Sequence, residues 1–137
     1  MLIISHRGNL NGVSTNENTI DQIISAHRNG FDVEIDIWFC NGSFYLGHDE
    51  PTTVVEECFL TQSWIWCHAK NLEALCELSR IGSHFFWHES DKLTITNRGV
   101  FWCANGVFLK NGITVTNSLD LPPDILGICT DNPISYL

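Results

Sequence analysis

Residues 31–40 read Phe-Asp-Val-Glu-Ile-Asp-Ile-Trp-Phe-Cys, and this stretch decides more about the fold than any other part of the chain. Its apolar residues alternate with Glu34 and Asp36, a period of two that predicts a strand with one buried face and one acidic face. The Asn-Gly pair at 41–42 predicts a tight turn, after which residues 44–46 return as the arm of a hairpin. The two carboxylates are therefore expected on one side of a sheet.

The segments on either side of this strand predict further strands and helices in alternation. Residues 2–5 form a short apolar run that ends before Gly8, and residues 16–29 carry apolar side chains at a helical period. Further along, residues 64–67 are typical of a buried strand and residues 71–80 of an amphipathic helix. Strands joined by helices favour a parallel sheet, because parallel neighbours need a crossover connection.

After Gly82 the pattern changes, since strand-like runs follow one another with little room for helices between them. These runs are residues 85–88, 93–96, 100–103, 113–116 and 125–129. About eight main strands predict an α/β fold: a compact (β/α) TIM-type barrel with reduced outer helices and a second half that is mostly β. Such barrels usually take about 250 residues, so the missing length must come from the outer helices. No linker divides the chain, and we expect residues 1–137 to form a single domain.

Composition restricts the classes of partner. The chain is 44% hydrophobic and 17% charged, which is typical of a packed globular protein. Its net charge of -9 argues against broad contact with nucleic acid and against attraction to an anionic membrane surface. No apolar stretch approaches the roughly 18 residues that span a bilayer, so we expect a cytoplasmic protein without membrane insertion. A shortened barrel can expose apolar edges through which two copies associate, so a dimer is an alternative to a monomer.

The six cysteines show no C-x-x-C pair, and several lie within apolar runs, as in Ile128-Cys129. We interpret them as reduced, buried small side chains. Disulfides remain the alternative, because spacing alone does not exclude them.

Polar residues close several predicted strands, which is where the catalytic groups of a parallel barrel lie. Glu34 and Asp36 stand two apart on one strand, so their side chains point to the same face and can share one cation. Oxygen ligands of this kind suit Mg²⁺ or Ca²⁺ rather than a thiolate-bound metal. The alternative is a solvated strand face. Inside a barrel, however, two unpaired carboxylates would be costly, and a cation removes that cost.

Histidines and basic residues at other strand ends predict a site for a phosphate ester. His6 and His48 could act as general base and general acid on opposite sides of a phosphodiester. Arg7 and Lys70 supply positive donors for the phosphate oxygens. Each of these residues alone is more often structural or solvated, so the prediction depends on their occurring together. Asp131 could orient a neighbouring group, but a capping or turn role is the interpretation that we favour.

Four motifs together resemble the glycerophosphodiester phosphodiesterases, members of the superfamily of barrels that includes phosphatidylinositol-specific phospholipase C. The motifs are His6-Arg7-Gly8, Glu17-Asn18-Thr19, Glu34-Ile35-Asp36 and His48-Asp49. The resemblance implies that the two histidines form the acid–base pair, that Arg7 contacts the phosphate and that the carboxylates of the Glu-Ile-Asp motif bind the metal. It also implies that Glu17 is a further ligand or a partner that orients Arg7.

Beyond residue 50 the resemblance thins. Residues 67–70, Cys-His-Ala-Lys, resemble the family's E-x-K strand, and residues 127–133, Gly-Ile-Cys-Thr-Asp-Asn-Pro, resemble its closing strand. His68 stands where the family has a third acidic metal ligand. Three alternatives follow: the imidazole binds the metal, Glu89 on the next strand substitutes for the missing ligand, or the metal is held more weakly.

We therefore expect metal-dependent hydrolysis of a phosphodiester, with a small glycerophosphodiester as substrate and glycerol phosphate and an alcohol as products. Attack by water and attack by a substrate hydroxyl both remain open. One alternative is a non-catalytic barrel module that binds a phosphorylated ligand or a protein partner, since the third acidic ligand is missing. Another is a phospholipase or lyase of the same superfamily, which the lack of an amphipathic membrane helix disfavours.

Overall fold

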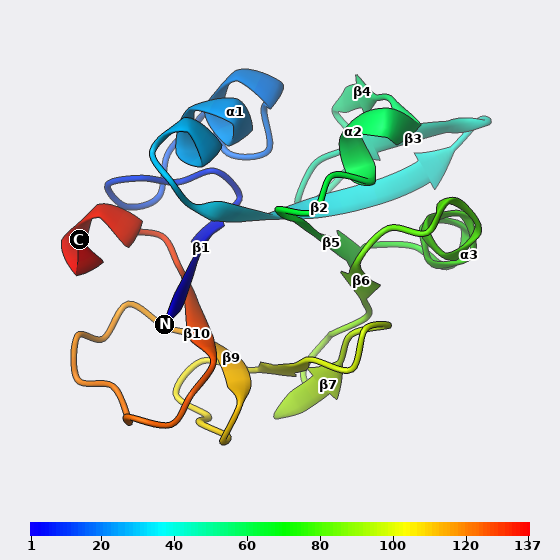
Figure 1. Ribbon diagram of the computed structural model, residues 1–137. Helices are drawn as coiled ribbons and strands as arrows, with labels where there is room; N and C mark the ends of the chain where they lie inside the picture. Colours follow the sequence, from blue (N-terminus) through cyan, green and yellow to red (C-terminus); the bar gives the residue numbers. More distant parts are fainter.

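Ten short strands form one mixed sheet in the computed structural model, which describes residues 1–137 (Figure 1). The strands are β1 Leu2–His6, β2 Asp32–Cys40, β3 Ser43–Leu46, β4 Thr53–Val55, β5 Ile65–Ala69, β6 Phe85–Phe86, β7 Leu93–Ile95, β8 Phe101–Cys103, β9 Gly112–Val115 and β10 Gly127–Thr130. The helices are α1 Ile20–Arg28, α2 Glu57–Leu60, α3 Leu72–Ile81 and the 3-10 helix η1 Pro133–Tyr136. All three α-helices lie before β6, so the second half of the chain consists mainly of strands and loops.

The sheet is parallel from β6 through β5, β2, β1, β10 and β9 to β8. Antiparallel strands extend it, because β7 pairs with β8, β3 with the second half of β2, and β4 with β3. The sheet curls strongly (Figure 1), and the backbone N–H of Asn97, just after β7, donates to the Phe85 carbonyl of β6 at 3.0 Å. The carboxyl ends of the parallel strands therefore meet along one rim of the curled sheet.

The prediction of a TIM-type barrel with outer helices is wrong. The sheet is an open, curled half-barrel, in which α1 packs against β2 and α3 packs against β2, β5 and β6. No α-helix follows β8 or β9, because the connections to the next strands are loops of residues 104–111 and 116–126. A crossover with a helix needs about a dozen residues, and Pro122 and Pro123 further disfavour a helix in the second loop. The short chain keeps the parallel strand order without the helical layer.

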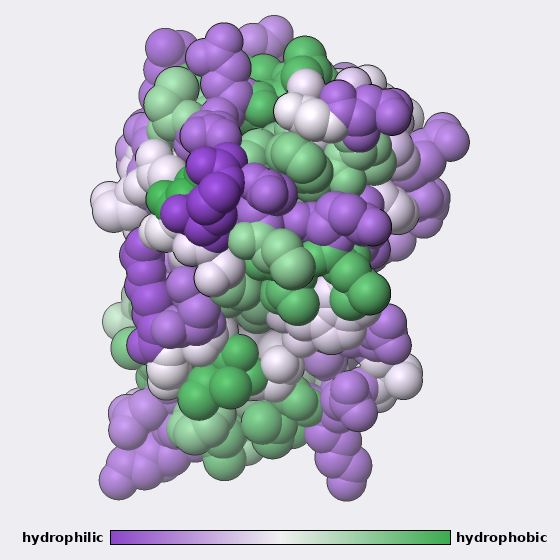
Figure 2. All heavy atoms as spheres, turned by 90° about the vertical axis from the view of Figure 1, so that its right-hand side faces the viewer, coloured by the Kyte–Doolittle hydropathy of each residue, from purple (hydrophilic) through white to green (hydrophobic).

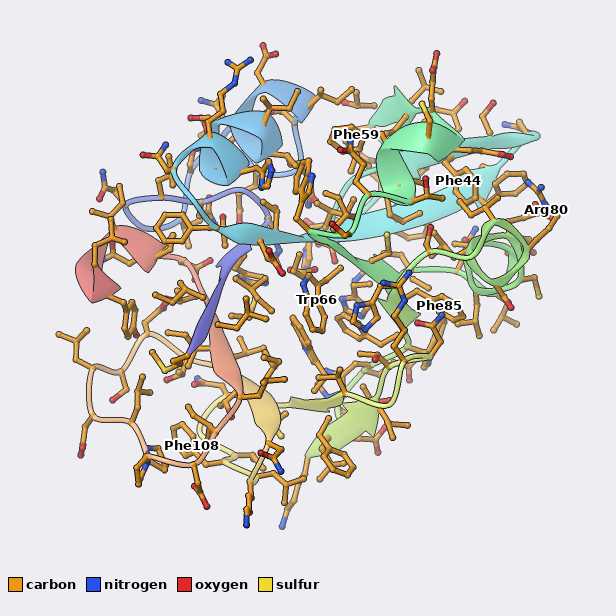
Figure 3. All side chains as sticks on the ribbon, in the orientation of Figure 1. Phe44, Phe59, Trp66, Arg80, Phe85 and Phe108 are labelled. Carbon is orange, nitrogen blue, oxygen red and sulfur yellow. The ribbon has the colours of Figure 1, made fainter.

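Two apolar clusters lie on opposite faces of the sheet. The outer cluster joins the apolar face of β2 to α1 and α3. The inner cluster fills the concave side and consists of Ile4, Trp66, Phe86, Trp102, Ile113 and Cys129. Trp66 points into the space that the sheet encloses, whereas Phe44 and Phe59 lie outside it (Figure 3). His6 and His68 lie two positions after the cluster members Ile4 and Trp66, and Asp131 lies two positions after Cys129, just beyond the end of β10. Side chains two positions apart point to the same side of a strand, so these three residues lie on the side of the inner cluster.

The surface of the second half carries apolar residues that no helix covers. Leu93 and Ile95 of β7 and Phe101 of β8 are exposed. On the face drawn in Figure 2, apolar patches lie among hydrophilic side chains.

None of the helices has the length and apolar character that crossing a membrane requires. The dimer stays a prediction.

All six cysteines are free thiols. Cys67, Cys103 and Cys129 are buried, as predicted. Cys58 and Cys76 are exposed, so the prediction of burial is wrong for these two, which lie on the helices α2 and α3 rather than on strands.

Asn71 ties the start of α3 to β2. Its Oδ1 accepts from the backbone N–H groups of Ala74 at 3.0 Å and of Phe39 at 3.1 Å, and its Nδ2 donates to the Phe39 carbonyl at 2.9 Å. We expect Asn71→Ala to lower the free energy of unfolding by about 2–3 kcal/mol, because the helix loses its cap and two backbone groups of β2 lose their partner. Urea unfolding measures this loss. As a control, Asn16→Ala removes an exposed side chain without hydrogen bonds, and its free energy of unfolding should stay within about 0.5 kcal/mol of that of the wild type. Equal losses in the two variants would contradict a stabilising role for the Asn71 hydrogen bonds.

Candidate metal and phosphate site

The register of the strands brings the predicted acidic and histidine residues together at one rim of the sheet. His6, the last residue of β1, lies opposite Glu34 of β2. Asp36, two residues further along β2, lies opposite His68 of β5. The four side chains share the concave face, next to the inner apolar cluster.

Glu34, Asp36 and His68 form a compact set of candidate metal ligands. One ligand atom from each lies within 4.8 Å of the others. Glu34 and Asp36 are only 2% and 1% exposed, and neither oxygen of the Glu34 carboxylate has a hydrogen-bond partner. An ionised carboxylate buried without donors is costly, so the chemistry of this set fits a cation.

The pKa values of the two carboxylates shift in opposite directions. Burial, followed by the charge of Asp36, raises the pKa of Glu34 from 4.5 to about 7. Burial also acts to raise the pKa of Asp36, but contacts with His68, Asn18 and Arg7 outweigh it and lower that pKa to about 2. Asp36 is therefore the permanent anion of the cluster, and Glu34 is the carboxylate that lacks a hydrogen-bond donor.

The pKa of Glu34 predicts a pH-dependent stability of the metal-free protein. Because the pKa is higher in the folded state, the folded protein keeps a proton that the unfolded chain releases, and Glu34 destabilises the fold progressively as the pH rises from about 4.5 to about 7. In EDTA, Glu34→Gln should abolish this loss, so the variant should gain stability relative to the wild type between pH 5 and pH 8. Urea unfolding at the two pH values measures the gain, and an unchanged difference between the proteins would contradict it.

His68 is oriented as a ligand by the backbone. Its Nε2 lies 2.8 Å from the His88 carbonyl oxygen, which can only accept, so Nε2 carries a proton. Its Nδ1 lies 3.2 Å from Asp36 Oδ1. Burial lowers the pKa of His68, but Asp36 and Glu34 outweigh that effect and raise it. A histidine whose outer nitrogen is held by a carbonyl is the usual arrangement at metal sites. Glu89 is exposed and lies outside this set.

His6 is held by a residue that the sequence analysis interpreted as a turn residue. Its Nδ1 lies 2.7 Å from Asp131 Oδ1, and its Nε2 lies 3.4 Å from Glu34 Oε2. The hydrogen bond from His6 lowers the pKa of Asp131 to about 2, so Asp131 is ionised and accepts the Nδ1 proton. Burial lowers the pKa of His6, but Glu34 and Asp131 outweigh it and raise that pKa. Asp131 therefore orients His6, which is the alternative to the capping or turn role that the sequence favoured.

Arg7 and Asn18 link the loops after β1 and before α1 to Asp36. Arg7 Nε lies 3.2 Å from Asp36 Oδ2, and Arg7 Nη1 lies 3.4 Å from Glu17 Oε2. Asn18 donates from Nδ2 to Asp36 Oδ2 at 3.0 Å and accepts from the Asp36 backbone N–H at 3.1 Å. Arg7 and Asn18 both have left-handed backbone conformations, with φ of 58° and 55°, which is a cost that functional loops often carry. Glu17 thus contacts Arg7 and lies outside the set of ligands in this structure.

Two predicted site residues are not brought into this arrangement. The His48 side chain is 43% exposed and its Nδ1 lies 2.7 Å from Asp49 Oδ1, and it lines neither cavity at the site. Lys70 follows β5, but it makes no ion pair and lines neither cavity. Asn9, which the sequence analysis missed, donates to Glu17 at 2.8 Å and to Asp131 at 2.9 Å.

Two adjoining cavities open at this rim. The smaller, of about 240 Å³, is lined by Glu34, His68 and Arg7 together with the rings of Phe86 and Trp102. The larger, of about 360 Å³, extends toward the ends of β9 and β10. His6 lines both cavities, so it stands between the candidate metal ligands and a second, separate space.

The chain was compared with protein families, curated proteins and solved structures, and no relative was found. Neither a family model, nor a curated protein, nor a solved structure matches the chain. The resemblance to the glycerophosphodiester phosphodiesterases therefore rests on the motifs alone.

Proposed function

We propose that this protein is a divalent-cation-dependent phosphodiesterase that hydrolyses a small glycerophosphodiester to glycerol phosphate and an alcohol. The observation that carries the proposal is the buried Glu34 carboxylate, which has no hydrogen-bond partner and lies beside Asp36, His68 and His6. A purely structural role does not explain why a buried carboxyl group without a hydrogen-bond partner is retained at the rim of a cavity.

Glu34, Asp36 and His68 would hold the cation. The two carboxylates suit Mg²⁺ or Ca²⁺, and the imidazole adds affinity for Mn²⁺ or Zn²⁺. When bound, such a cation supplies positive charge to the phosphate and makes a nearby hydroxyl or water more acidic.

His6 is the proposed proton carrier. Its Nδ1 proton is committed to Asp131, which leaves Nε2 on the side of Glu34 and the cavities. In its protonated form, which its raised pKa favours, His6 donates the Nε2 proton to the oxygen of the departing alcohol. Arg7 lines the same cavity as Glu34, and its planar guanidinium has donors beyond the two that face Asp36 and Glu17. Those donors would bind a phosphate oxygen.

Turnover assays test the proposal. The purified protein is incubated with glycerophosphocholine, glycerophosphoethanolamine or glycerophosphoinositol in Mg²⁺, Ca²⁺, Mn²⁺, Zn²⁺ or EDTA. We expect release of glycerol phosphate with at least one cation and none in EDTA. Turnover that EDTA does not reduce would exclude the role of the metal, and no turnover of any substrate with any cation would contradict the enzymatic proposal.

The second candidate is a non-catalytic module that binds a phosphorylated ligand. The position of His48 favours it, since the second histidine of the implied acid–base pair is exposed and paired with Asp49. His48→Ala separates the two candidates. If His48 is the second member of the acid–base pair, the substitution should lower kcat, whereas a binding module should show ligand binding without turnover in both proteins.

A further inference from the structure

The larger cavity is placed to receive the part of the substrate that leaves. It shares His6, Asn105 and Val115 with the smaller cavity, so the two spaces adjoin at the proposed proton carrier. The candidate metal ligands Glu34 and His68 line only the smaller cavity. A phosphate bound beside those ligands would therefore have its ester oxygen near His6 and its alcohol in the larger cavity.

The polar lining of the larger cavity has hydrogen-bonding capacity that the protein does not use. Asn117 Oδ1 accepts from the Thr130 hydroxyl at 2.7 Å and from the Asp131 backbone N–H at 3.0 Å, so the orientation of the amide is fixed. The Asn117 amino group has a single contact, at 3.5 Å to Asp131 Oδ2. The side chain of Asn105 is exposed and makes no hydrogen bond, and Thr116 accepts one bond but donates none. Three neutral donors are thus free for a ligand.

The same lining disfavours charged alcohols. No Lys or Arg lines the larger cavity, so a second anionic group has no counter-charge there. No aromatic ring other than the His6 imidazole lines it, so a trimethylammonium group finds no aromatic cage. An ammonium group can only donate hydrogen bonds, so it would leave the free donors of Asn105, Asn117 and Thr116 without an acceptor. The one carboxylate, Asp131, is paired with His6 at 2.7 Å and accepts from Asn9 through the same Oδ1, and its Oδ2 faces the Asn117 amino group at 3.5 Å, so its charge is already partnered.

We infer that the larger cavity is a subsite for a neutral, polyhydroxylated alcohol such as glycerol or a cyclitol, an inference that rests on the proposed function. Each hydroxyl of a polyol both accepts and donates, which matches amide and hydroxyl groups on the lining. The volume of about 360 Å³ lies near the lower end of the roughly 300–1,000 Å³ of ligand pockets, which suits a small alcohol rather than an acyl chain. The enzyme would therefore prefer glycerophosphoinositol to glycerophosphocholine.

Binding without turnover tests this subsite. Protein labelled with ¹⁵N is titrated in EDTA with glycerophosphoinositol, glycerophosphocholine, glycerophosphoethanolamine or free myo-inositol, and the side-chain amide signals of Asn105 and Asn117 are followed by NMR. We expect the inositol diester to shift both signals and to bind at least about fivefold more tightly than the choline and ethanolamine diesters. Asn105→Ala should reduce this preference to below about twofold. Asn16→Ala, which removes an exposed asparagine that lines neither cavity, should leave it unchanged.

The outcomes separate the subsite from the proposed function. Free myo-inositol that shifts the Asn105 and Asn117 signals, in a protein that turns over no diester, would support the subsite and contradict the phosphodiesterase. If the protein turns over diesters but binds the choline diester as tightly as the inositol diester or more tightly, the subsite is contradicted and the proposal of phosphodiesterase activity still stands. If neither myo-inositol nor the inositol diester shifts the two amide signals, the subsite is wrong.

Discussion

Replacing His6 with alanine should lower kcat/KM for glycerophosphodiester hydrolysis by about 10²- to 10⁴-fold, the usual contribution of a positioned acid or base. His6 is the one histidine that is both fixed by a partly buried hydrogen bond to Asp131 and placed at the junction of the two cavities. Its removal leaves Glu34, Asp36 and His68 in place, so cation binding should fall far less than the rate. Steady-state kinetics with the preferred cation, combined with a cation titration, measure both effects.

A control with a second histidine separates chemistry from folding. His27 lies on α1, where its ring stacks on Trp64 at 3.9 Å on the outer side of the sheet, so His27→Ala should affect stability but not the chemical step. If His6→Ala keeps the wild-type kcat/KM, or if the two substitutions reduce it equally at matched folded fractions, His6 is not the proton carrier.

Replacing Asp36 with alanine should weaken cation binding by more than about 100-fold. Loss of an outer partner of a metal ligand commonly costs roughly 10- to 100-fold in affinity, and Asp36 is itself a proposed ligand. Asp36 also holds Arg7 and Asn18, so Asp36→Asn, which keeps the shape and one oxygen, serves as the less disruptive variant. Calorimetric titration with Mn²⁺ measures the affinity.

Asp124→Ala provides the matched control, because it removes one exposed carboxylate outside the proposed ligand set. Its Mn²⁺ affinity should equal that of the wild type. Equal affinities of the wild type, Asp36→Asn and Asp36→Ala would show that the cation binds elsewhere.

Local sequence pattern predicted the parts of the site that depend on a single strand. The alternation in residues 31–40 placed Glu34 and Asp36 on one face, and both side chains are indeed buried on the concave face of β2. The positions of His6 and His68 followed from the ends of apolar runs. These predictions needed only the period of two that side chains have in any strand.

The parts that depend on long-range pairing were missed or misread. His6 and Asp131 lie 125 residues apart and meet only because β1 pairs in parallel with β10. Asp131 closes an apolar strand as the other predicted site residues do, but an Asp before Asn-Pro is equally typical of a turn. Asn9 and Asn18 lie in loops, where no periodic pattern predicts which side chains face the sheet.

The barrel prediction failed because strand order and the helical layer are separate properties. Parallel neighbours were expected and are present from β6 to β8, but the expectation of an outer helical layer came from the usual form of such barrels. Loops of residues 104–111 and 116–126 are long enough to connect parallel strands and too short to add helices. The position of His48 depends on a similar local detail, because Gly47 has a φ of 151° and its N–H donates to the Asp36 carbonyl, which sets the direction in which the following loop leaves the hairpin.

The most direct test of the central claim is a crystal structure of the protein with Mn²⁺, examined by anomalous scattering. The account predicts one strong peak within roughly 2.0–2.6 Å of carboxylate oxygens of Glu34 and Asp36 and of Nδ1 of His68. It also predicts that the peak is lost in Asp36→Ala. A crystal that shows no peak at this cluster under saturating Mn²⁺, or a peak held by other residues, would contradict the claim that these three residues form a metal site.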